Sequence, residues 1–230
     1  MQREEVRALL EEVAYLITGN LASILETRYE FKLKHDGTPV TQSDLLIEQR
    51  VRRLVEAKLS NVSFIGEESF DFVSRSTDGY RVVLDPIDGT ENFCSGLKEW
   101  GVSFGIWKDA AHLGSLLLLP EMGLRLMTGD HVIPVNSRLI GLSSSMSAEV
   151  LNILQEPGEY RIYGCAVYNI YNVIHGYYQK FINPKGAYVW DLLPGIMLAL
   201  EQGCNVLIEG KPYLGEWLDP TRKYRIEIRR

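Results

Sequence analysis

The sequence predicts a layered α/β or α+β domain, and two patterns carry this prediction. Residues 3–27 place apolar side chains three and four positions apart, as an amphipathic helix does. Residues 101–107 and 113–119 are two apolar stretches joined by a short polar segment, which indicates a pair of antiparallel strands. Helix and strand candidates then alternate along the rest of the chain. Such a mixture favours sheets covered by helices.

The other elements follow from the same local rules. A loop at residues 34–42 precedes a helix that Thr41 or Ser43 could cap, and its apolar stripe ends near residue 59. The remaining strands are expected at 62–65, 81–84, 124–127, 138–142, 160–163, 177–182 and 205–208, the remaining helices at 147–154, 166–175 and 191–202, and a polar loop at 69–79. We treat residues 1–230 as a single domain with a half of about residues 1–135 and a smaller half of 136–230.

The composition excludes several classes of protein. With a net charge of −6 the chain lacks the basic surface that nucleic-acid binding requires, and no apolar run approaches the length of a membrane span. The three cysteines are odd in number and lack CxxC spacing, which argues against a disulfide framework or a zinc knuckle. The acidic N-terminus does not resemble a signal peptide. We therefore expect a cytoplasmic protein.

A short segment at residues 85–90 carries the strongest chemical signal. It follows the apolar residues 82–84, which indicate the end of a buried strand. Asp85 and Asp88 offer carboxylates and Ile87 an exposed carbonyl, and Mg²⁺ prefers such oxygen ligands. Gly89 permits a backbone that a side chain would hinder, and a helical turn after it would point free N–H groups at a phosphate.

Further acids lie at the ends of other predicted elements. Glu67 follows a strand, Asp191 begins a helix, and Asp44 and Glu48 lie in the first turns of another helix. Taken singly, each has a structural interpretation: a solvated strand end, a helix cap, or an acid near a positive helix terminus. Hydrolysis of a phosphate ester with magnesium requires several carboxylates at one edge, and these positions could supply them.

The motif resembles the signature of the inositol monophosphatase family, which comprises Mg²⁺-dependent, lithium-sensitive phosphomonoesterases. Three other motifs of that family follow in the expected order, at residues 34–44, 66–69 and 190–191. The matching residues of the signature are Asp85-Pro86-Ile87-Asp88-Gly89-Thr90-Glu91-Asn92-Phe93. The resemblance implies an αβαβα sandwich and a homodimer.

The resemblance also implies roles for individual residues. Glu67, Asp85 and the Ile87 carbonyl would bind a first magnesium ion, Asp85, Asp88 and Asp191 a second, and Glu67 would share in a third, weaker site. Glu67 and the hydrogen-bonded pair of Asp44 and Thr90 would be catalytic, the pair by orienting and deprotonating the attacking water. Lys34 would add positive charge to a metal-site loop. The residues implied to contact substrate are Asp88, Gly89, Thr90, Gly164, Cys165, Ala166, Gln179 and Asp191.

Two of these positions depart from the family pattern. Cys165 stands where Ser or Thr is usual, and Gln179 stands where inositol-specific members carry a glutamate. We expect a small phosphorylated polyol or sugar as substrate, with inositol monophosphate preferred. Fructose 1,6-bisphosphate, 3′-phosphoadenosine 5′-phosphate and NADP are alternatives, and the dipeptide Asn92-Phe93 favours the inositol branch. A non-catalytic regulatory scaffold is the alternative from another class.

Overall fold

Two mixed sheets and the helices packed on them form the molecule, which a computed structural model describes at residues 1–70, 79–144 and 146–230. The predicted loop at 69–79 therefore lies largely outside the described residues. The first sheet has the order β3-β4-β5-β6-β7, and its strands are antiparallel except for the parallel pair β3–β4. Its strands are β3 (Val62–Gly66), β4 (Tyr80–Asp88), β5 (Gly101–Lys108), β6 (Ala111–Leu119) and β7 (Leu124–Met127).

The second sheet comes from the later part of the chain and has the order β12-β11-β13-β10-β8-β9. Its strands are β8 (Leu139–Leu142), β9 (Glu159–Ile162), β10 (Lys180–Ala187), β11 (Asn205–Ile208), β12 (Lys211–Pro212) and β13 (Tyr224–Arg229). β13 lies between β11 and β10, so the last strand of the chain is central to this sheet.

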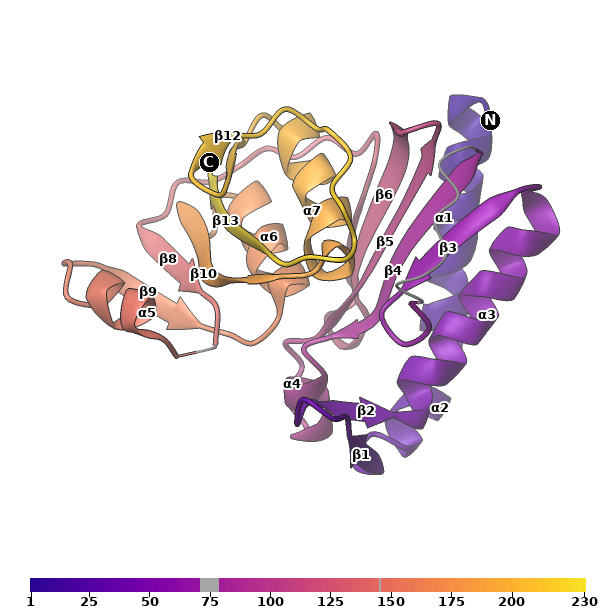
Figure 1. Cartoon of the computed structure of the whole chain (residues 1–230), viewed down its shortest axis with the longest axis horizontal. Coiled ribbons are helices and arrows are strands. Elements are labelled where there is room, and N and C mark those ends of the chain that lie inside the picture. Colours follow the sequence, from indigo (N-terminus) through magenta and orange to yellow (C-terminus); the bar gives the residue numbers. More distant parts are fainter. Residues whose placement is uncertain (71–78, 145) are drawn as a thin grey trace.

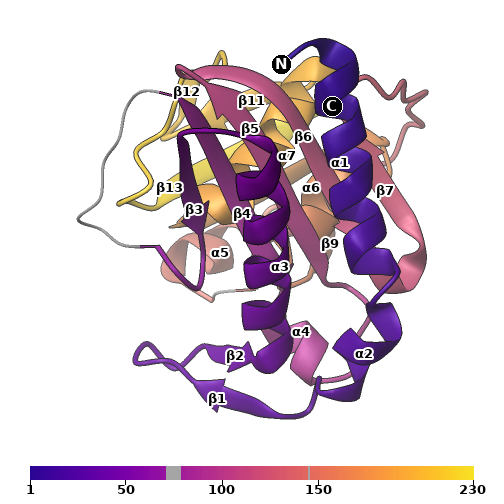
Figure 2. The same ribbon diagram turned by 90° about the vertical axis from the view of Figure 1, so that its right-hand side faces the viewer.

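The helices complete five layers, as Figures 1 and 2 show. α1 (Arg3–Thr18) and α3 (Gln42–Lys58) cover the outer face of the first sheet. α6 (Ala166–Ile174) and α7 (Val189–Glu201) lie between the two sheets, and α5 (Ala148–Ile153) packs on the far side of the second. The expected αβαβα sandwich is confirmed.

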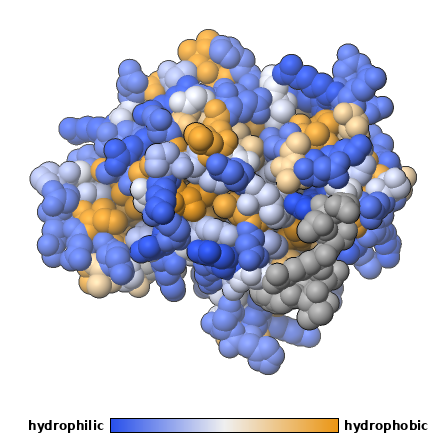
Figure 3. All heavy atoms as spheres, turned by 45° about the horizontal axis from the view of Figure 1, so that its top comes forward, coloured by the Kyte–Doolittle hydropathy of each residue, from blue (hydrophilic) through white to orange (hydrophobic). Residues whose placement is uncertain are grey.

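Apolar side chains fill the spaces between these layers. One cluster joins α1 and α3 to the first sheet, and a second surrounds α6 and α7 between the sheets. Trp100 and Trp107, on or beside β5, are fully buried. On the surface, apolar side chains remain interspersed with charged ones, as the face in Figure 3 shows. No helix among the described residues is long and apolar enough to cross a membrane.

Several predicted elements need correction. The helix expected over 3–27 is two helices, α1 and α2 (Leu21–Glu26), because the Asn20 side chain donates to the carbonyl of Leu16 and ends the first one. The expected loop at 34–42 contains a hairpin of β1 (Phe31–Leu33) and β2 (Pro39–Thr41). The strand placed at 177–182 begins at Lys180, and β13 was not predicted.

Candidate active site

The parallel pair β3–β4 brings the first two acids together. Gly66 lies opposite Leu84 in the register, so the residues that follow, Glu67 and Asp85, emerge side by side at the carboxyl end of the pair. The N–H of Glu67 donates to the carbonyl of Leu84 at 3.1 Å, which fixes this register at its last step. Two segments distant in the sequence therefore supply neighbouring carboxylates.

β4 does not end after residues 82–84, as the sequence suggested, but continues to Asp88 through a bulge. Asp85 pairs with Ser103 and Asp88 with Gly101, so β4 has one residue more than β5 over this stretch. Pro86 has no N–H for the ladder, and Oδ1 of Asp85 accepts the N–H of Ile87 at 3.0 Å. Oδ2 of Asp85 is buried and has no partner within the described residues.

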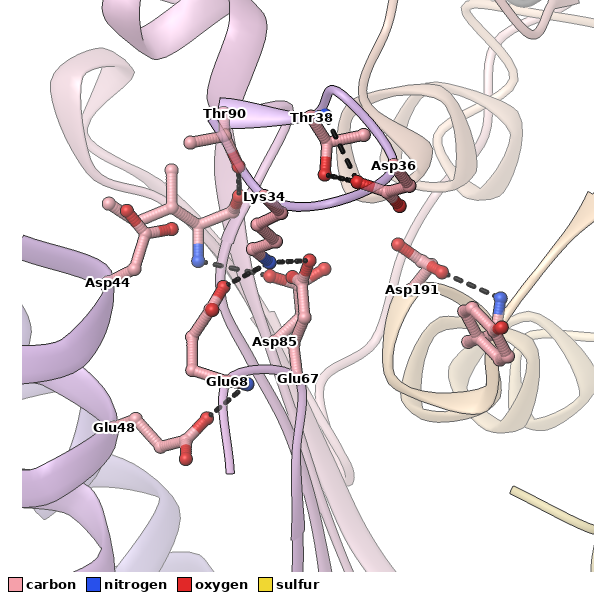
Figure 4. Close-up of polar contacts among 12 residues, drawn as sticks. Lys34, Asp36, Thr38, Asp44, Glu48, Glu67, Glu68, Asp85, Thr90 and Asp191 are labelled. Atoms are coloured by element: carbon pink, nitrogen blue, oxygen red, sulfur yellow. Dashed lines mark hydrogen bonds and ion pairs between the residues drawn. The ribbon is translucent and has the colours of Figure 1, made fainter. Parts of the chain in front are cut away.

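Asp191 reaches the same place from the start of α7. The helix begins at Val189, so Asp191 is its third residue and not its cap, and it accepts the N–H of Tyr188 at 2.7 Å. Pro194 is the sixth residue of this helix. Asp85, Asp88 and Asp191 each present a carboxylate oxygen within 4.8 Å of the other two. Figure 4 shows Asp85 and Asp191 facing one another between the two halves of the sandwich.

A lysine accompanies the acids on the β3 side. The ammonium of Lys34, which follows β1, lies 2.9 Å from Oε1 of Glu67 and 2.7 Å from Oε1 of Glu68. Oε2 of Glu48, a buried residue of α3, accepts the N–H of Glu68 at 2.9 Å. Glu48 thus fixes the segment that carries Glu67, a positioning role that its place in the first turns of a helix did not reveal.

Burial makes this cluster hard to ionise without cations. It raises the pKa of Asp85 and of Asp191 well above the usual range, and the nearby charge of Glu67 raises both further. Burial likewise raises the pKa of Asp88 to about 7. Burial and then the charge of Glu67 raise the pKa of Glu68 to about 7. Oxygen ligands, mutual repulsion and the unpartnered oxygen of Asp85 all fit hard divalent cations such as Mg²⁺.

Asp44 and Thr90 both lie near the cluster but are not joined by a hydrogen bond. Oδ2 of Asp44 accepts from the backbone N–H and hydroxyl of Thr41, which caps α3, and Oδ1 has no partner within the described residues. Thr90 donates its hydroxyl to the carbonyl of Ile87 at 2.9 Å. Burial raises the pKa of Asp44 to about 6. The catalytic pair implied by the resemblance remains a prediction.

The segment before α6 closes the other side of Asp88. The thiol of Cys165 lies 3.1 Å from Oδ2 of Asp88, and the N–H of Val167 donates to the same oxygen. Gly89 has φ of +83° and is the N-cap of α4 (Thr90–Cys94), the helical turn expected after it. A Cβ on Gly89 would lie 2.9 Å from Cβ of Cys165, so glycine is needed here for space as well as for backbone conformation.

A cavity of about 490 Å³ opens over these groups. Gly164, Cys165 and Ala166 line it, as expected. Gln179 does not: its side chain is exposed and donates to the carbonyl of Arg138, because it precedes β10 instead of lying within it. Asn183, four residues further on, lines the cavity in its place.

Several other residues line the cavity; Trp190 belongs to the motif at residues 190–191, whereas the others carried no local signal in the sequence. Tyr188 and Trp190 stack at 4.6 Å between ring centroids, and Lys223 lies 4.9 Å from the Tyr188 ring. Phe70 adds a third ring, 5.6 Å from that of Trp190. These residues come from three separate segments, and only the fold brings them together.

Together, the αβαβα sandwich and its oxygen-only acidic cluster define a class, the metal-assisted phosphoric monoester hydrolases. The sequence description of the inositol monophosphatase family matches residues 2–132, more than half of the chain. The chain therefore belongs to the inositol monophosphatase family, as its motifs indicated, and the members of this family are phosphatases.

Curated relatives agree with this assignment. Inositol monophosphatase 2 of Saccharomyces cerevisiae is 27% identical over 224 residues, which cover 83% of this chain and 75% of the yeast protein. Histidinol-phosphatase of Chlorobaculum parvum is 36% identical over 90 residues, which cover 39% of this chain and 34% of that protein. A crystal structure of an IMPase/NADP phosphatase complexed with Mg²⁺ and phosphate shares the fold, with a TM-score of 0.81 and 15% identity over 99% of this chain and 91% of that one.

Proposed function

We propose that the protein hydrolyses a small organic phosphate monoester with the help of Mg²⁺. The observation that carries this proposal is the convergence of Asp85, Asp88 and Asp191 within 4.8 Å at the floor of a cavity. The buried Oδ2 of Asp85 has no hydrogen-bond partner within the described residues, so a cation would satisfy an oxygen that the protein leaves unpaired. A relative of the same fold was crystallised with Mg²⁺ and phosphate, which supports this ligand pair.

Each residue of the cluster has a distinct task in this proposal. Bound Mg²⁺ would supply Lewis-acid stabilisation of the phosphate and a more acidic water. Glu67, Asp85, Asp88, Asp191 and the Ile87 carbonyl would hold the ions. The free N–H groups of Gly89 and Thr90 at the start of α4 would hold the phosphate. Asp44, whose buried Oδ1 has no partner among the described residues, and Thr90 would together orient and deprotonate the attacking water, which requires the Thr90 hydroxyl to turn from the Ile87 carbonyl towards Asp44.

The same proposal includes the number of metal ions, the oligomeric state, the cellular location and the division of the domain. Mutual repulsion of the acids supports two or three magnesium ions, and lithium would compete for one of these sites. Exposed apolar side chains of Tyr29, Phe31 and Leu33 beside the β1–β2 hairpin support a homodimer. Three unpaired buried cysteines support a cytoplasmic location. We retain the division of the single domain near residue 135, where the two sheets separate along the chain.

The substrate is proposed to be a small phosphorylated polyol or sugar, with inositol monophosphate first, on the strength of the signature and the yeast relative. NADP is the alternative that the IMPase/NADP phosphatase of the same fold supports. Because Gln179 lies outside the cavity, it is not proposed to contact substrate. Asn183 is the polar side chain of β10 that lines the cavity and could bond a hydroxyl.

A phosphate-release assay tests the proposal. We would supply Mg²⁺ with inositol 1-phosphate, fructose 1,6-bisphosphate, 3′-phosphoadenosine 5′-phosphate, NADP and 2-glycerophosphate. Asp88→Asn should abolish release, because it removes a charge from the metal cluster, whereas Asp109→Asn in the β5–β6 turn should not. Release that persists in Asp88→Asn would contradict the proposal. If folded wild-type protein releases phosphate from none of these substrates, the scaffold hypothesis takes its place.

A further inference from the structure

We infer that Arg28 is a positioning residue for the turn that carries Thr90 to the acidic cluster. Arg28 lies between α2 and β1, is buried, and is outside the lining of the cavity. The inference rests on the proposed function, because it assumes that a phosphate binds at the cluster. It adds a residue that controls phosphate binding without touching the substrate.

The guanidinium of Arg28 bonds the backbone at the end of α4. Its Nε donates to the carbonyl of Phe93 at 2.9 Å, and its Nη2 donates to the carbonyl of Leu97 at 3.1 Å. The same group lies over the Phe93 ring, 4.8 Å from its centroid. Arginine presents its donors in one rigid plane, so these bonds fix the orientation of the backbone as well as its position.

A second hydrogen bond transmits this restraint to the cavity. The N–H of Phe93 donates to the carbonyl of Gly89 at 3.0 Å. That carbonyl and the N–H of Thr90 belong to one planar peptide unit, so fixing the carbonyl also fixes the direction of the N–H. Gly89 and Thr90 line the cavity, where the proposed function places this N–H against the phosphate. Arg28 therefore acts on the binding group through a short chain of bonds, which polarise one another.

Glu121 extends the restraint to the other end of the segment 89–100. Its carboxylate, from the turn between β6 and β7, lies 2.8 Å from Nη2 of Arg28 and accepts the indole N–H of Trp100 at 2.6 Å. Trp100 directly precedes the residue of β5 that pairs with Asp88. The rings of Trp100 and Phe93 meet edge to face, with centroids 5.0 Å apart. One buried ion pair thus holds both ends of the segment.

The chemistry of the pair agrees with a positioning role. A buried ion pair contributes little net stability, because the cost of removing both charges from water offsets their attraction. Apolar side chains of similar volume could fill the same space, but they could not hold the carbonyls of Phe93 and Leu97. We therefore attribute the pair of Arg28 and Glu121 to the placement of the turn.

Calorimetry with inorganic phosphate tests the role of Arg28. Arg28→Lys keeps a positive charge beside Glu121, but one ammonium cannot reproduce the fork that reaches two carbonyls. At saturating Mg²⁺, its Kd for inorganic phosphate should rise about fivefold, the equivalent of about 1 kcal/mol. Its Kd for Mg²⁺ without phosphate should stay within about twofold of the wild type, because Asp85 and Asp191 lie on other elements.

Arg225→Lys is the matched control. It makes the same change at an exposed ion pair with Glu209, 2.7 Å long, and should leave both binding constants as they are in the wild type. Urea unfolding of each variant establishes that the protein is folded under the conditions of the binding experiment. Wild-type phosphate affinity in folded Arg28→Lys would overturn the inference. An equal loss of Mg²⁺ affinity would also overturn it, because the whole cluster would then be disturbed.

A double variant separates positioning from stability. Arg28→Met combined with Glu121→Leu removes the pair without leaving a buried charge unpaired, so it should be more stable than Arg28→Met alone. Its Kd for inorganic phosphate should nevertheless remain about fivefold or more above that of the wild type, because the two carbonyls stay unheld. Recovery of phosphate affinity together with stability would show a merely structural role and overturn the inference.

The proposed function and this inference fail in different ways. If Arg28→Lys weakens phosphate binding as expected while the wild type releases phosphate from no substrate, the inference stands and the proposed hydrolysis falls. If the wild type releases phosphate and folded Arg28→Lys binds it equally well, the inference alone falls. If the wild type binds no phosphate at saturating Mg²⁺, both fall.

Discussion

The charge of Asp88 should destabilise the folded protein whenever metal is removed. Asp88 is buried, and its pKa rises from 3.8 to about 7 in the folded state. At about 1.4 kcal/mol per pH unit, its ionisation in the fold costs about 4 kcal/mol above pH 7. Asp88→Asn removes that cost. The amide oxygen can still accept from Val167, so we subtract only about 1 kcal/mol for weaker bonding and expect a net gain of about 3 kcal/mol.

The pH dependence of this gain follows from the direction of the pKa shift. A carboxyl whose pKa is raised on folding contributes stability below its unfolded pKa of 3.8 and loses it as pH rises towards 7. The advantage of Asp88→Asn in EDTA should therefore grow by about 2–3 kcal/mol between pH 5 and pH 8. Saturating Mg²⁺ should stabilise the wild type and reduce the difference in free energy of unfolding between the wild type and Asp88→Asn, because a ligand of the native state shifts the unfolding equilibrium.

Urea unfolding, followed by tryptophan fluorescence, measures these free energies. Asp109→Asn is the matched control, since it makes the same chemical change at a surface turn where the side chain accepts the N–H of Gly79. Its free energy of unfolding should stay within about 0.5 kcal/mol of the wild type. Two results would refute the reasoning: Asp88→Asn less stable than the wild type in EDTA at pH 8, or an advantage that does not change with pH.

Three further changes test other parts of the structure by urea unfolding. Gly89→Ala should lower the free energy of unfolding by about 2–4 kcal/mol, because its φ is +83° and the new Cβ would lie 2.9 Å from Cβ of Cys165. Gly203→Ala, at φ +78° with open space around it, should cost about 1 kcal/mol. Equal costs for the two variants would contradict the close approach at Gly89. Arg28→Met should cost about 3–5 kcal/mol because the largely buried carboxylate of Glu121 loses its ion-pair partner and keeps the indole N–H of Trp100. A double variant with Glu121→Leu that recovers nothing would argue against this cause. Burial lowers the pKa of His112 from 6.5 to about 4, so the stability that the neutral ring provides above pH 6.5 is lost as pH falls towards 4. Between pH 8 and pH 5 the free energy of unfolding of the wild type should therefore fall by about 2 kcal/mol more than that of His112→Asn. Parallel pH profiles of the two proteins would refute this.

Local periodicity predicted the layers of this fold but not every strand. The paired strands β5 and β6 and the helices α6 and α7 carry long apolar patterns, and the structure contains each of them. β13 also has a pattern, because Tyr224, Ile226 and Ile228 alternate with polar residues, but a six-residue alternation near the end of a chain is easily missed. The break between α1 and α2 depends on one asparagine side chain, which apolar spacing does not register.

The residues of the candidate site also include some that the sequence could identify and some that it could not. Acids that lie within ordered motifs, such as Asp85 and Glu67, could be found because the chemistry requires them at fixed positions relative to a strand end. Lys223 and Tyr188 could not, because their significance arises only where the β12–β13 connection passes over the start of α7. Gln179 was assigned by its resemblance to a family position, which does not fix where a side chain points; in the structure it precedes β10 and donates to the carbonyl of Arg138 outside the cavity.

The bulge in β4 determines whether the cluster can exist at all. In a regular strand, side chains alternate between the two faces, so residues three apart point in opposite directions. Asp85 and Asp88 are three apart, whereas their partners Ser103 and Gly101 are two apart; if β4 were regular over this stretch, one of the acids would face away from the other. The irregularity at Pro86 thus converts an odd spacing into an even one. A shorter sequence that joined the two acids through a single residue would place them on one face without any bulge.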